Sequence, residues 1–290
     1  MSRFRIRHRL DYHYNRAALL TPQLIRLLPR HDAFQQVTDW RLRISPDPAQ
    51  QQELVGLDGN RLVSCRFDIP VEGWSLVAEG EVETTLTNPF DFLVEDWANR
   101  LPIDYPLSLR QALHPYLQGT LPNGAFEPET VRLAQELCHT HHGYPVSFVM
   151  GLCEQLNRTI RYEGRESGDP FLPGWTLKRK AGSCRDIAVV FLDACRAMGL
   201  AARFVSGYHC GTDNADRYDL HAWVEVYFPG AGWRGLDPTL GLAVGDRHIA
   251  LATAATPLLA APISGRVLGA GLATRLDFHI GIETLELQQR

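Results

Sequence analysis

The chain has 290 residues, 45% of them hydrophobic and 21% charged, which is the composition of a soluble globular protein with ample core. Its formal charge of −4 argues against a dedicated nucleic-acid binder, which normally has a strongly basic face. The charged start MSRFRIRHRL, and the lack of an uncharged stretch of bilayer length, predict neither a secretory signal nor a membrane partner. Six cysteines in so long a chain do not suggest a disulfide framework, so we expect free thiols and a cytoplasmic location.

Residues 1–88 are predicted to form an antiparallel, sandwich-like β domain. Apolar residues alternate with polar ones from Phe4 to Tyr14, as a half-buried strand requires. The same period of two returns in three later runs, which start at Trp40, Val63 and Leu76. The turn-forming sequences PDP and DGN lie between these runs, as an antiparallel sheet or sandwich requires.

Residues 128–290 are predicted to form an α+β core. Apolar stripes of helical period indicate three helices, at 128–141, 146–160 and 184–198. Strands are expected after them at 202–208, 220–228 and 233–236. The apolar but proline-interrupted stretch 249–263 is predicted to be loop or short strand. Between the two domains, the proline-rich residues 89–127 are predicted to be a connecting region with one short helix near 107–114.

Cys184, in AGSCRD, stands at the start of the last predicted helix. Ser183 followed three residues later by Asp186 has the pattern of a capping box, which begins a helix. A cysteine in the first turn feels the positive end of the helix dipole, which favours the reactive thiolate. Cys184 is therefore the candidate nucleophile; the alternative is one more small buried side chain.

A thiol nucleophile needs a base, and the base needs a third group to fix its tautomer. His221 shares one face of a predicted strand with Trp223, and the residues that alternate with them would face the core. Asp237 follows the tight connection PGAG. If Phe228 pairs with Gly232, Asp237 lies opposite Trp223 and on the face of His221, whereas a slip of one residue would turn it away. His221 is thus the candidate base and Asp237 its candidate orienting group.

Acyl transfer also needs hydrogen-bond donors for the oxyanion. The backbone N–H of Cys184, at a helix N-terminus, is a natural donor. Trp175, just upstream in PGWTLKRK, is a weak candidate for the second donor, because a packed aromatic is the commoner role of such a residue.

Several stretches resemble the transglutaminase-like superfamily, in particular the bacterial transglutaminase-like cysteine proteases. They are GSCRDIAVVFLDACRAMGLAARFVSGY, DLHAWVEVYFPGAGWRGLDPTLGL, HIALATAATPLLAAPISG and, in the front half, LTPQLIRLLPRHDAFQQV and LDGNRLVSCRF. The resemblance implies a papain-like α+β core behind an N-terminal β domain. It implies Cys184 as nucleophile, His221 as base and Asp237 as orienter, and acyl transfer through a thioester without a cofactor. In the crosslinking members a Trp usually follows the cysteine, whereas Arg185 stands there.

Three outcomes are compatible with this triad. Water as acceptor gives hydrolysis of an amide, peptide or isopeptide bond in a peptide or protein substrate, which we favour because water is always present. An amine acceptor gives transglutaminase-type transfer. The third is a non-catalytic interaction module, against which the intact triad argues.

A metal site is a further alternative. Cys138, His141 and His142 have helical spacing, and Cys153 lies on the next helix, but the pattern matches no standard zinc site, so no metal is predicted. His209 and His248 receive no role.

Overall fold

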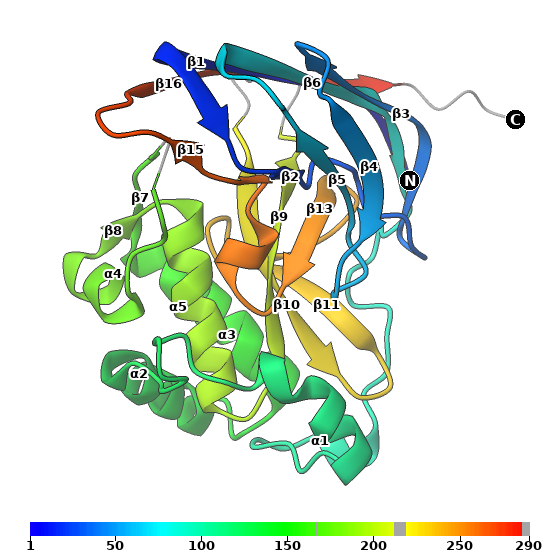
Figure 1. Cartoon of the computed structure of the whole chain (residues 1–290). Coiled ribbons are helices and arrows are strands. Elements are labelled where there is room, and N and C mark those ends of the chain that lie inside the picture. Colours follow the sequence, from blue (N-terminus) through cyan, green and yellow to red (C-terminus); the bar gives the residue numbers. More distant parts are fainter. Residues whose placement is uncertain (166–167, 212–218, 286–290) are drawn as a thin grey trace, which may run out of the picture.

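The structure is a computed structural model of the whole chain, and it describes residues 1–165, 168–211 and 219–285. It is an α+β protein with antiparallel sheets, as predicted. A β domain lies over a core in which helices pack on a sheet (Figure 1). None of the helices in the described ranges is long and apolar enough to cross a membrane.

The β domain consists of two antiparallel sheets. The larger contains β15 (Val267–Leu268), β1 (Ser2–Leu20), β6 (Val71–Thr84) and β3 (Gln35–Ser45), with β16 (Thr274–Leu285) also paired to β1. The smaller contains β14 (Ile263–Ser264), β2 (Gln23–Ile25), β5 (Arg61–Arg66) and β4 (Gln50–Val55). Alternate residues of β1 from Phe4 to Leu10 are buried while the arginines between them face solvent. Phe4, Ile6 and Leu10 form one hydrophobic cluster with residues of β2 and β5, so the two sheets pack together.

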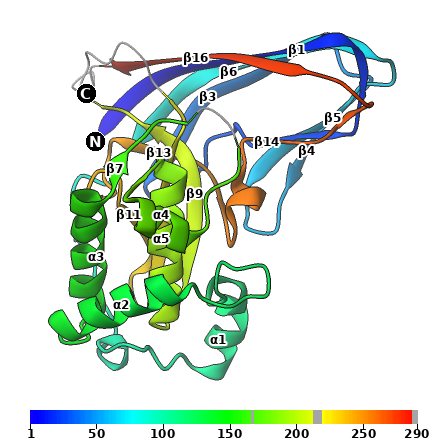
Figure 2. The same cartoon turned by 90° about the vertical axis from the view of Figure 1, so that its left-hand side faces the viewer.

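The last described strand does not stay with the core. Residues 274–285 fall within the range 128–290 that the sequence assigned to the core, yet β16 pairs with β1 from Arg3 opposite Leu285 to Tyr14 opposite Thr274. The chain therefore returns to the β domain at its end, as Figure 2 shows. A strand's partner depends on tertiary contacts rather than on its own pattern, so periodicity alone could not place it.

The core sheet has the order β12 (Leu242–Ala243), β11 (Gly232–Asp237), β10 (His221–Phe228), β9 (Ala202–His209) and β13 (His248–Ala254). Its helices are α2 (Pro128–Thr140), α3 (Pro145–Thr159), α4 (Pro173–Arg179) and α5 (Cys184–Ala197). The remaining short elements are η1 (Asp96–Ala98), α1 (Leu107–Leu113), η2 (His114–Tyr116), β7 (Arg161–Tyr162), β8 (Ala181–Gly182) and η3 (Pro257–Ala260). The helices and strands that were predicted are found within a few residues. Several elements were not predicted, among them β4, β16 and α4, which is a single short segment without a long periodic pattern.

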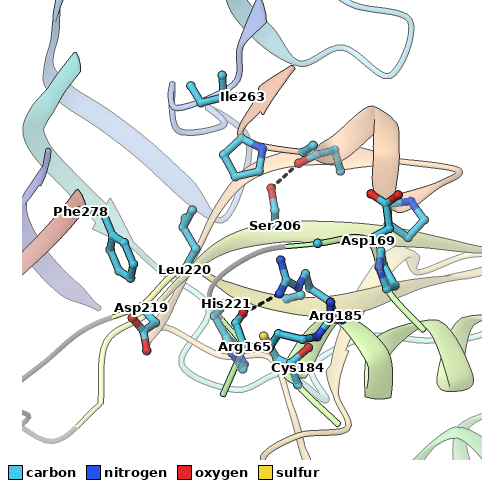
Figure 3. A pocket seen from close by; sticks show the side chains of 18 of the residues that line it. Arg165, Asp169, Cys184, Arg185, Ser206, Asp219, Leu220, His221, Ile263 and Phe278 are labelled. Atoms are coloured by element: carbon cyan, nitrogen blue, oxygen red, sulfur yellow. Dashed lines mark hydrogen bonds between the residues drawn. The ribbon is translucent and has the colours of Figure 1, made fainter. Parts of the chain in front are cut away.

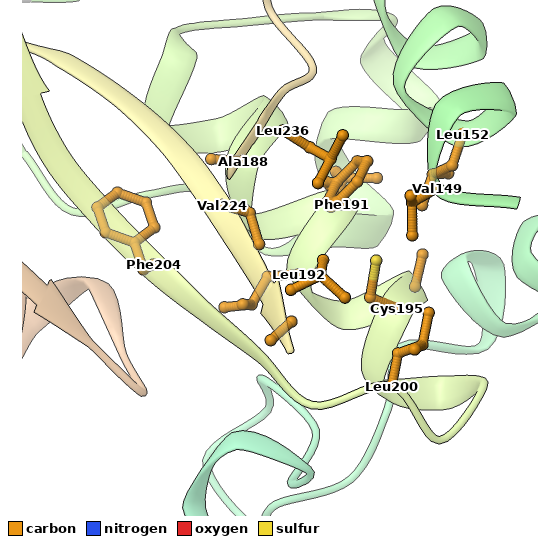
Figure 4. Close-up of a cluster of buried hydrophobic side chains, with 14 of the residues drawn as sticks. Val149, Leu152, Ala188, Phe191, Leu192, Cys195, Leu200, Phe204, Val224 and Leu236 are labelled. Carbon is orange, nitrogen blue, oxygen red and sulfur yellow. The ribbon is translucent and has the colours of Figure 1, made fainter. Parts of the chain in front are cut away.

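Helix α5 is the centre of the core. Phe191, Leu192 and Cys195 are fully buried and pack between α3 and strands β10 and β11, which contribute Val149, Leu152, Val224 and Leu236 (Figure 4). Truncating one such leucine to alanine costs about 2–5 kcal/mol. The burial of α5 therefore holds its first residue, Cys184, in a fixed position.

The β domain is bound to the open edge of the core sheet by two side-chain amides. Gln35 accepts from the backbone N–H of Ala250 at 2.8 Å and donates to its carbonyl at 3.0 Å. Asn60 does the same at Thr253, at 2.9 and 2.7 Å. Both amides pair with the backbone N–H and C=O groups of β13 as a neighbouring strand would. The edge strand is therefore covered, and the position of the β domain on the core is fixed.

A buried ion pair also joins the β domain to strand β10 of the core sheet. Glu225 in β10 is only 5% exposed, and its carboxylate accepts from Arg30 of the β domain at 2.8 and 3.1 Å and from Arg203 at 2.7 Å. Burial would raise its pKa, but the two guanidinium groups outweigh that effect and lower the pKa of Glu225 to about 2. The buried ion pair therefore links the domains across the sheet.

Replacing Glu225 by Gln would remove the carboxylate that Arg30 and Arg203 share, leaving Asp32 as the remaining counter-charge of Arg30. We expect Glu225→Gln to lower the free energy of unfolding by about 3–5 kcal/mol at pH 7, measured by urea denaturation. The matched control is Glu283→Gln, which breaks an exposed pair with Arg5 and should cost at most about 1 kcal/mol.

The pH dependence of this difference follows from the depressed pKa. The pair stabilises the fold fully above the usual pKa of 4.5 and loses this contribution as pH falls toward 2. The difference in the free energy of unfolding between wild type and Glu225→Gln should therefore decrease between pH 5 and pH 3. A difference that stays constant would contradict the assignment.

Candidate active site

Cys184 is the first residue of α5 and is 6% exposed. The predicted helix start is found: the backbone N–H and the hydroxyl of Ser183 both donate to Oδ2 of Asp186 at 2.7 Å. The N–H of the first helical residue has no partner inside the helix. Cys184 thus combines a fixed thiol with a donor available for an oxyanion.

Asp186 also fixes the segment in front of the nucleophile. Its Oδ1 accepts from the guanidinium of Arg165 at 2.7 Å and from the backbone N–H of Phe171 at 2.7 Å, and the carboxylate is fully buried. A Cβ at Gly182 would lie 2.9 Å from the Cβ of Asp186, closer than packed carbons approach, so a glycine is needed there. One carboxylate therefore positions both the helix start and one wall of the site.

His221 and Asp237 meet as the strand register predicted. Phe228 pairs with Gly232 and the ladder runs without a slip, which brings Nε2 of His221 to 2.6 Å from Oδ2 of Asp237. Burial favours the neutral ring, but Asp237 and the hydrogen-bonded side chain of Cys184 outweigh it and raise the pKa of His221 to about 10. Since Nε2 is used by Asp237, Nδ1 is the nitrogen left for the thiol.

Asp237 is fully buried and accepts four hydrogen bonds. Its Oδ1 accepts from the backbone N–H groups of Thr239 and Leu240 at 3.0 and 3.1 Å, and its Oδ2 accepts from His221 and His248. Burial would raise its pKa, but the two histidines hold the pKa of Asp237 well below its usual range. The carboxylate therefore stays charged where it orients His221.

His248 is one of the two histidines that the sequence left without a role. It begins β13, and its Nε2 lies 3.0 Å from Oδ2 of Asp237. Burial lowers the pKa of His248 against the pull of Asp237, so the neutral ring carries its proton on Nε2 and donates it. Its ring packs edge-on against Trp223, with centroids 5.2 Å apart, and lies 4.7 Å from that of His209. The pairing of β13 with β9 brings His248 next to Asp237, and no local sequence motif predicts that pairing.

Cys184 and His221 line a cavity of about 540 Å³ that both domains enclose. Leu10 of β1 and Phe278 of β16 come from the β domain, and Ile263 lies on the far side (Figure 3). The β domain is thus part of the site wall. Trp175, suggested as an oxyanion donor, is 54% exposed on α4 and outside the cavity lining, so that suggestion is wrong.

His221, Asp237 and His248 are also the one set among the described residues whose ligand atoms could surround a metal ion, all within 4.8 Å of one another. Around a tetrahedral ion with bonds of about 2.1 Å, two ligand atoms lie about 3.4 Å apart. The 2.6 Å between His221 and Asp237 is a direct hydrogen bond instead. Of the zinc ligands weighed in the sequence, Cys153 donates from Sγ to the backbone oxygen of Asp237 at 3.2 Å.

Comparison with known families identifies the class of protein. The family profile of the transglutaminase-like superfamily matches residues 132–238, which contain Cys184, His221 and Asp237. The bacterial transglutaminase-like N-terminal region matches residues 4–83. The two matches together cover more than half of the chain, which belongs to the transglutaminase-like superfamily and carries the N-terminal region of its bacterial members.

Individual relatives agree with this placement. The solved structure of "a Putative Cysteine Protease from Cytophaga hutchinsonii" matches with a TM-score of 0.74 over 100% of this chain and 92% of that chain, and at 18% identity it shows a common fold. An uncharacterized protein of Mycobacterium tuberculosis is 26% identical over 267 residues, 85% of this chain and 82% of its own. The protein-glutamine gamma-glutamyltransferase of Pseudomonas aeruginosa is 32% identical over 130 residues, or 40% of this chain. This match spans only 19% of the length of that relative.

His248→Phe would remove one donor from Oδ2 of Asp237 while keeping an aromatic ring beside Trp223. A hydrogen bond to a charged group is worth about 1.5–3 kcal/mol, so we expect alkylation of Cys184 at pH 6 to slow by about tenfold. His248→Gln, whose amide can donate, should keep more of the rate. His209→Phe is the matched control, because the described contacts of His209 include no hydrogen bond to Asp237. An equal loss in that variant would assign His248 a packing role only.

Proposed function

We propose that the chain is a thiol hydrolase that cleaves an amide, peptide or isopeptide bond through a thioester on Cys184. His221 is the base and general acid, and Asp237 holds its ring. The observation that carries the proposal is the position of Cys184 at the start of α5, on a cavity and beside a histidine whose Nε2 is 2.6 Å from a buried carboxylate.

The first half of the reaction forms the thioester. Because the pKa of His221 is raised, its ring takes the thiol proton and the sulfur becomes the nucleophile. Sγ attacks the carbonyl carbon, and the oxyanion accepts from the backbone N–H of Cys184. As the carbon–nitrogen bond breaks, His221 gives its proton to the leaving nitrogen, and the amine departs.

The second half releases the acyl group. Neutral His221 removes a proton from water, the resulting hydroxide adds to the thioester, and the carbon–sulfur bond breaks to give the carboxylic acid. The thiolate and the protonated ring are restored. An amine in place of water would form a new amide. This transfer is the alternative function, because one relative is named as a gamma-glutamyltransferase.

The other expectations remain part of the proposal. The mechanism needs no cofactor and no metal, and the substrate is a peptide or protein amide rather than a nucleic acid or a membrane component. All six cysteines are free, which supports work in the reducing cytoplasm.

The decisive test is the alkylation rate of each cysteine with iodoacetamide at pH 6, followed by peptide mass spectrometry. An ordinary thiol is almost entirely protonated at that pH. We expect fast, selective labelling of Cys184 and a loss of about 100-fold in His221→Ala. His141→Ala is the matched control, because His141 bonds to Ser147 outside the cavity. Labelling of Cys184 no faster than the other five thiols would favour the non-catalytic module.

The choice of acceptor is tested with an amide library incubated with and without a primary amine at about 10 mM. We expect the acid to remain the main product by mass spectrometry under both conditions. Predominant formation of the new amide would instead assign amine transfer, and Cys184→Ala must abolish either product.

A further inference from the structure

Arg185, the residue after the nucleophile, has a guanidinium group that lines the cavity. Figure 3 shows its side chain beside Cys184 and directed toward Ser206. Its Nη2 donates to the backbone oxygen of Arg165 at 2.6 Å. Within the described residues Arg185 forms no ion pair, so its positive charge meets a carbonyl dipole and not a carboxylate.

The other charged side chains of the cavity are committed elsewhere or lie apart. Arg165 is paired with the buried carboxylate of Asp186 at 2.7 Å. Asp219 is engaged in an interaction of its own. Asp169 is solvent-exposed and lies to the side of Arg185 in Figure 3, but the described residues show no ion pair between the two. Arg185 is therefore the cation beside the thiol that the described part of the chain leaves without a counter-ion.

Arg185 and Cys184 act on the same part of the cavity. Burial raises the pKa of Tyr162, the charges of Cys184 and Asp219 raise it further, and Arg185 lowers it. Cys184 and Arg185 are thus within electrostatic reach of one phenol. The start of α5 adds a positive field of the same sign.

This arrangement favours a carboxylate. A guanidinium carries five N–H donors in a planar fork that matches a carboxylate, and here one nitrogen is used by a carbonyl. A cation at this position affects which acyl group can lie beside the sulfur.

The size and the walls of the cavity limit the size of the substrate. A volume of about 540 Å³ lies within the range of sites for small molecules, roughly 300–1,000 Å³. Leu10, Leu276 and Phe278 of the β domain give it an apolar side. A short chain fits between these walls.

We propose that Arg185 selects an acyl donor that carries a carboxylate close to the scissile carbonyl, on a molecule no larger than a short peptide. The inference rests on the proposed function, since it takes Cys184 as the residue that accepts the acyl group. It narrows the substrate from any amide to a small anionic one.

The test compares two alkylating agents of equal size, iodoacetate, which carries a carboxylate, and iodoacetamide, which does not. The second-order rate constant of Cys184 with each is measured at pH 7 and low ionic strength by peptide mass spectrometry. His221 and the helix start also attract an anion, so the readout is the change in the iodoacetate-to-iodoacetamide ratio between variants. We expect Arg185→Gln to lower this ratio by about tenfold and Arg185→Lys to retain most of it.

The control is Arg110→Gln, which removes one exposed positive charge on α1, outside the cavity lining, and should leave the ratio unchanged. Circular dichroism checks each fold; if Arg185→Gln does not fold, Arg185→Met, which keeps an unbranched stem, replaces it. Fast labelling by iodoacetamide with a ratio that Arg185→Gln does not alter would overturn the inference and leave the thiol hydrolase intact. Slow labelling of wild-type Cys184 by both reagents would overturn the proposed function itself.

Discussion

The buried carboxylate of Asp237 is the constraint on which the site depends. A charge that is fully buried must be compensated by the protein, and here two imidazoles and two backbone N–H groups surround it. Each donor comes from a place that the fold must supply: His221 from β10, His248 from β13 and the N–H groups from the turn after β11. Only the assembled sheet can satisfy this carboxylate, and its satisfaction orients the ring that faces the thiol.

The β domain is a structural part of the candidate site. It supplies Arg30 to the buried Glu225 and the amides of Gln35 and Asn60 to β13, so it is fastened at several points of the core sheet. Strands β1 and β16 then close one side of the cavity. A cleft built between two firmly joined layers admits small or extended molecules more readily than folded ones. The β domain therefore contributes to substrate size as well as to stability.

The charged residues around the cavity fall into two groups. The first is the pair of the buried Asp186 with Arg165, in which Asp186 also caps α5, so these charges stabilise the structure. The second is Arg185, which is compensated only by a carbonyl among the described contacts. In the proposed mechanism Cys184, His221 and Asp237 perform the bond chemistry, whereas Arg185 lies on the wall that would meet the rest of the acyl group. Substrate preference is consequently a property of the wall and not of the triad.

Much of this protein followed from local sequence. The period of two in the front half, the helical stripes and the Ser183–Asp186 cap are short-range patterns, because side-chain direction along a strand or helix depends only on backbone geometry. The register of β10 and β11 followed from the length of one tight turn, which placed Asp237 on the face of His221. Three features depend on tertiary structure alone. Strand β16 pairs with β1, and β13 pairs with β9, which places His248 at Asp237. Trp175 lies outside the cavity. These are contacts between segments far apart in the chain, and no local period encodes them, because they arise only when the two domains bury their apolar faces against each other.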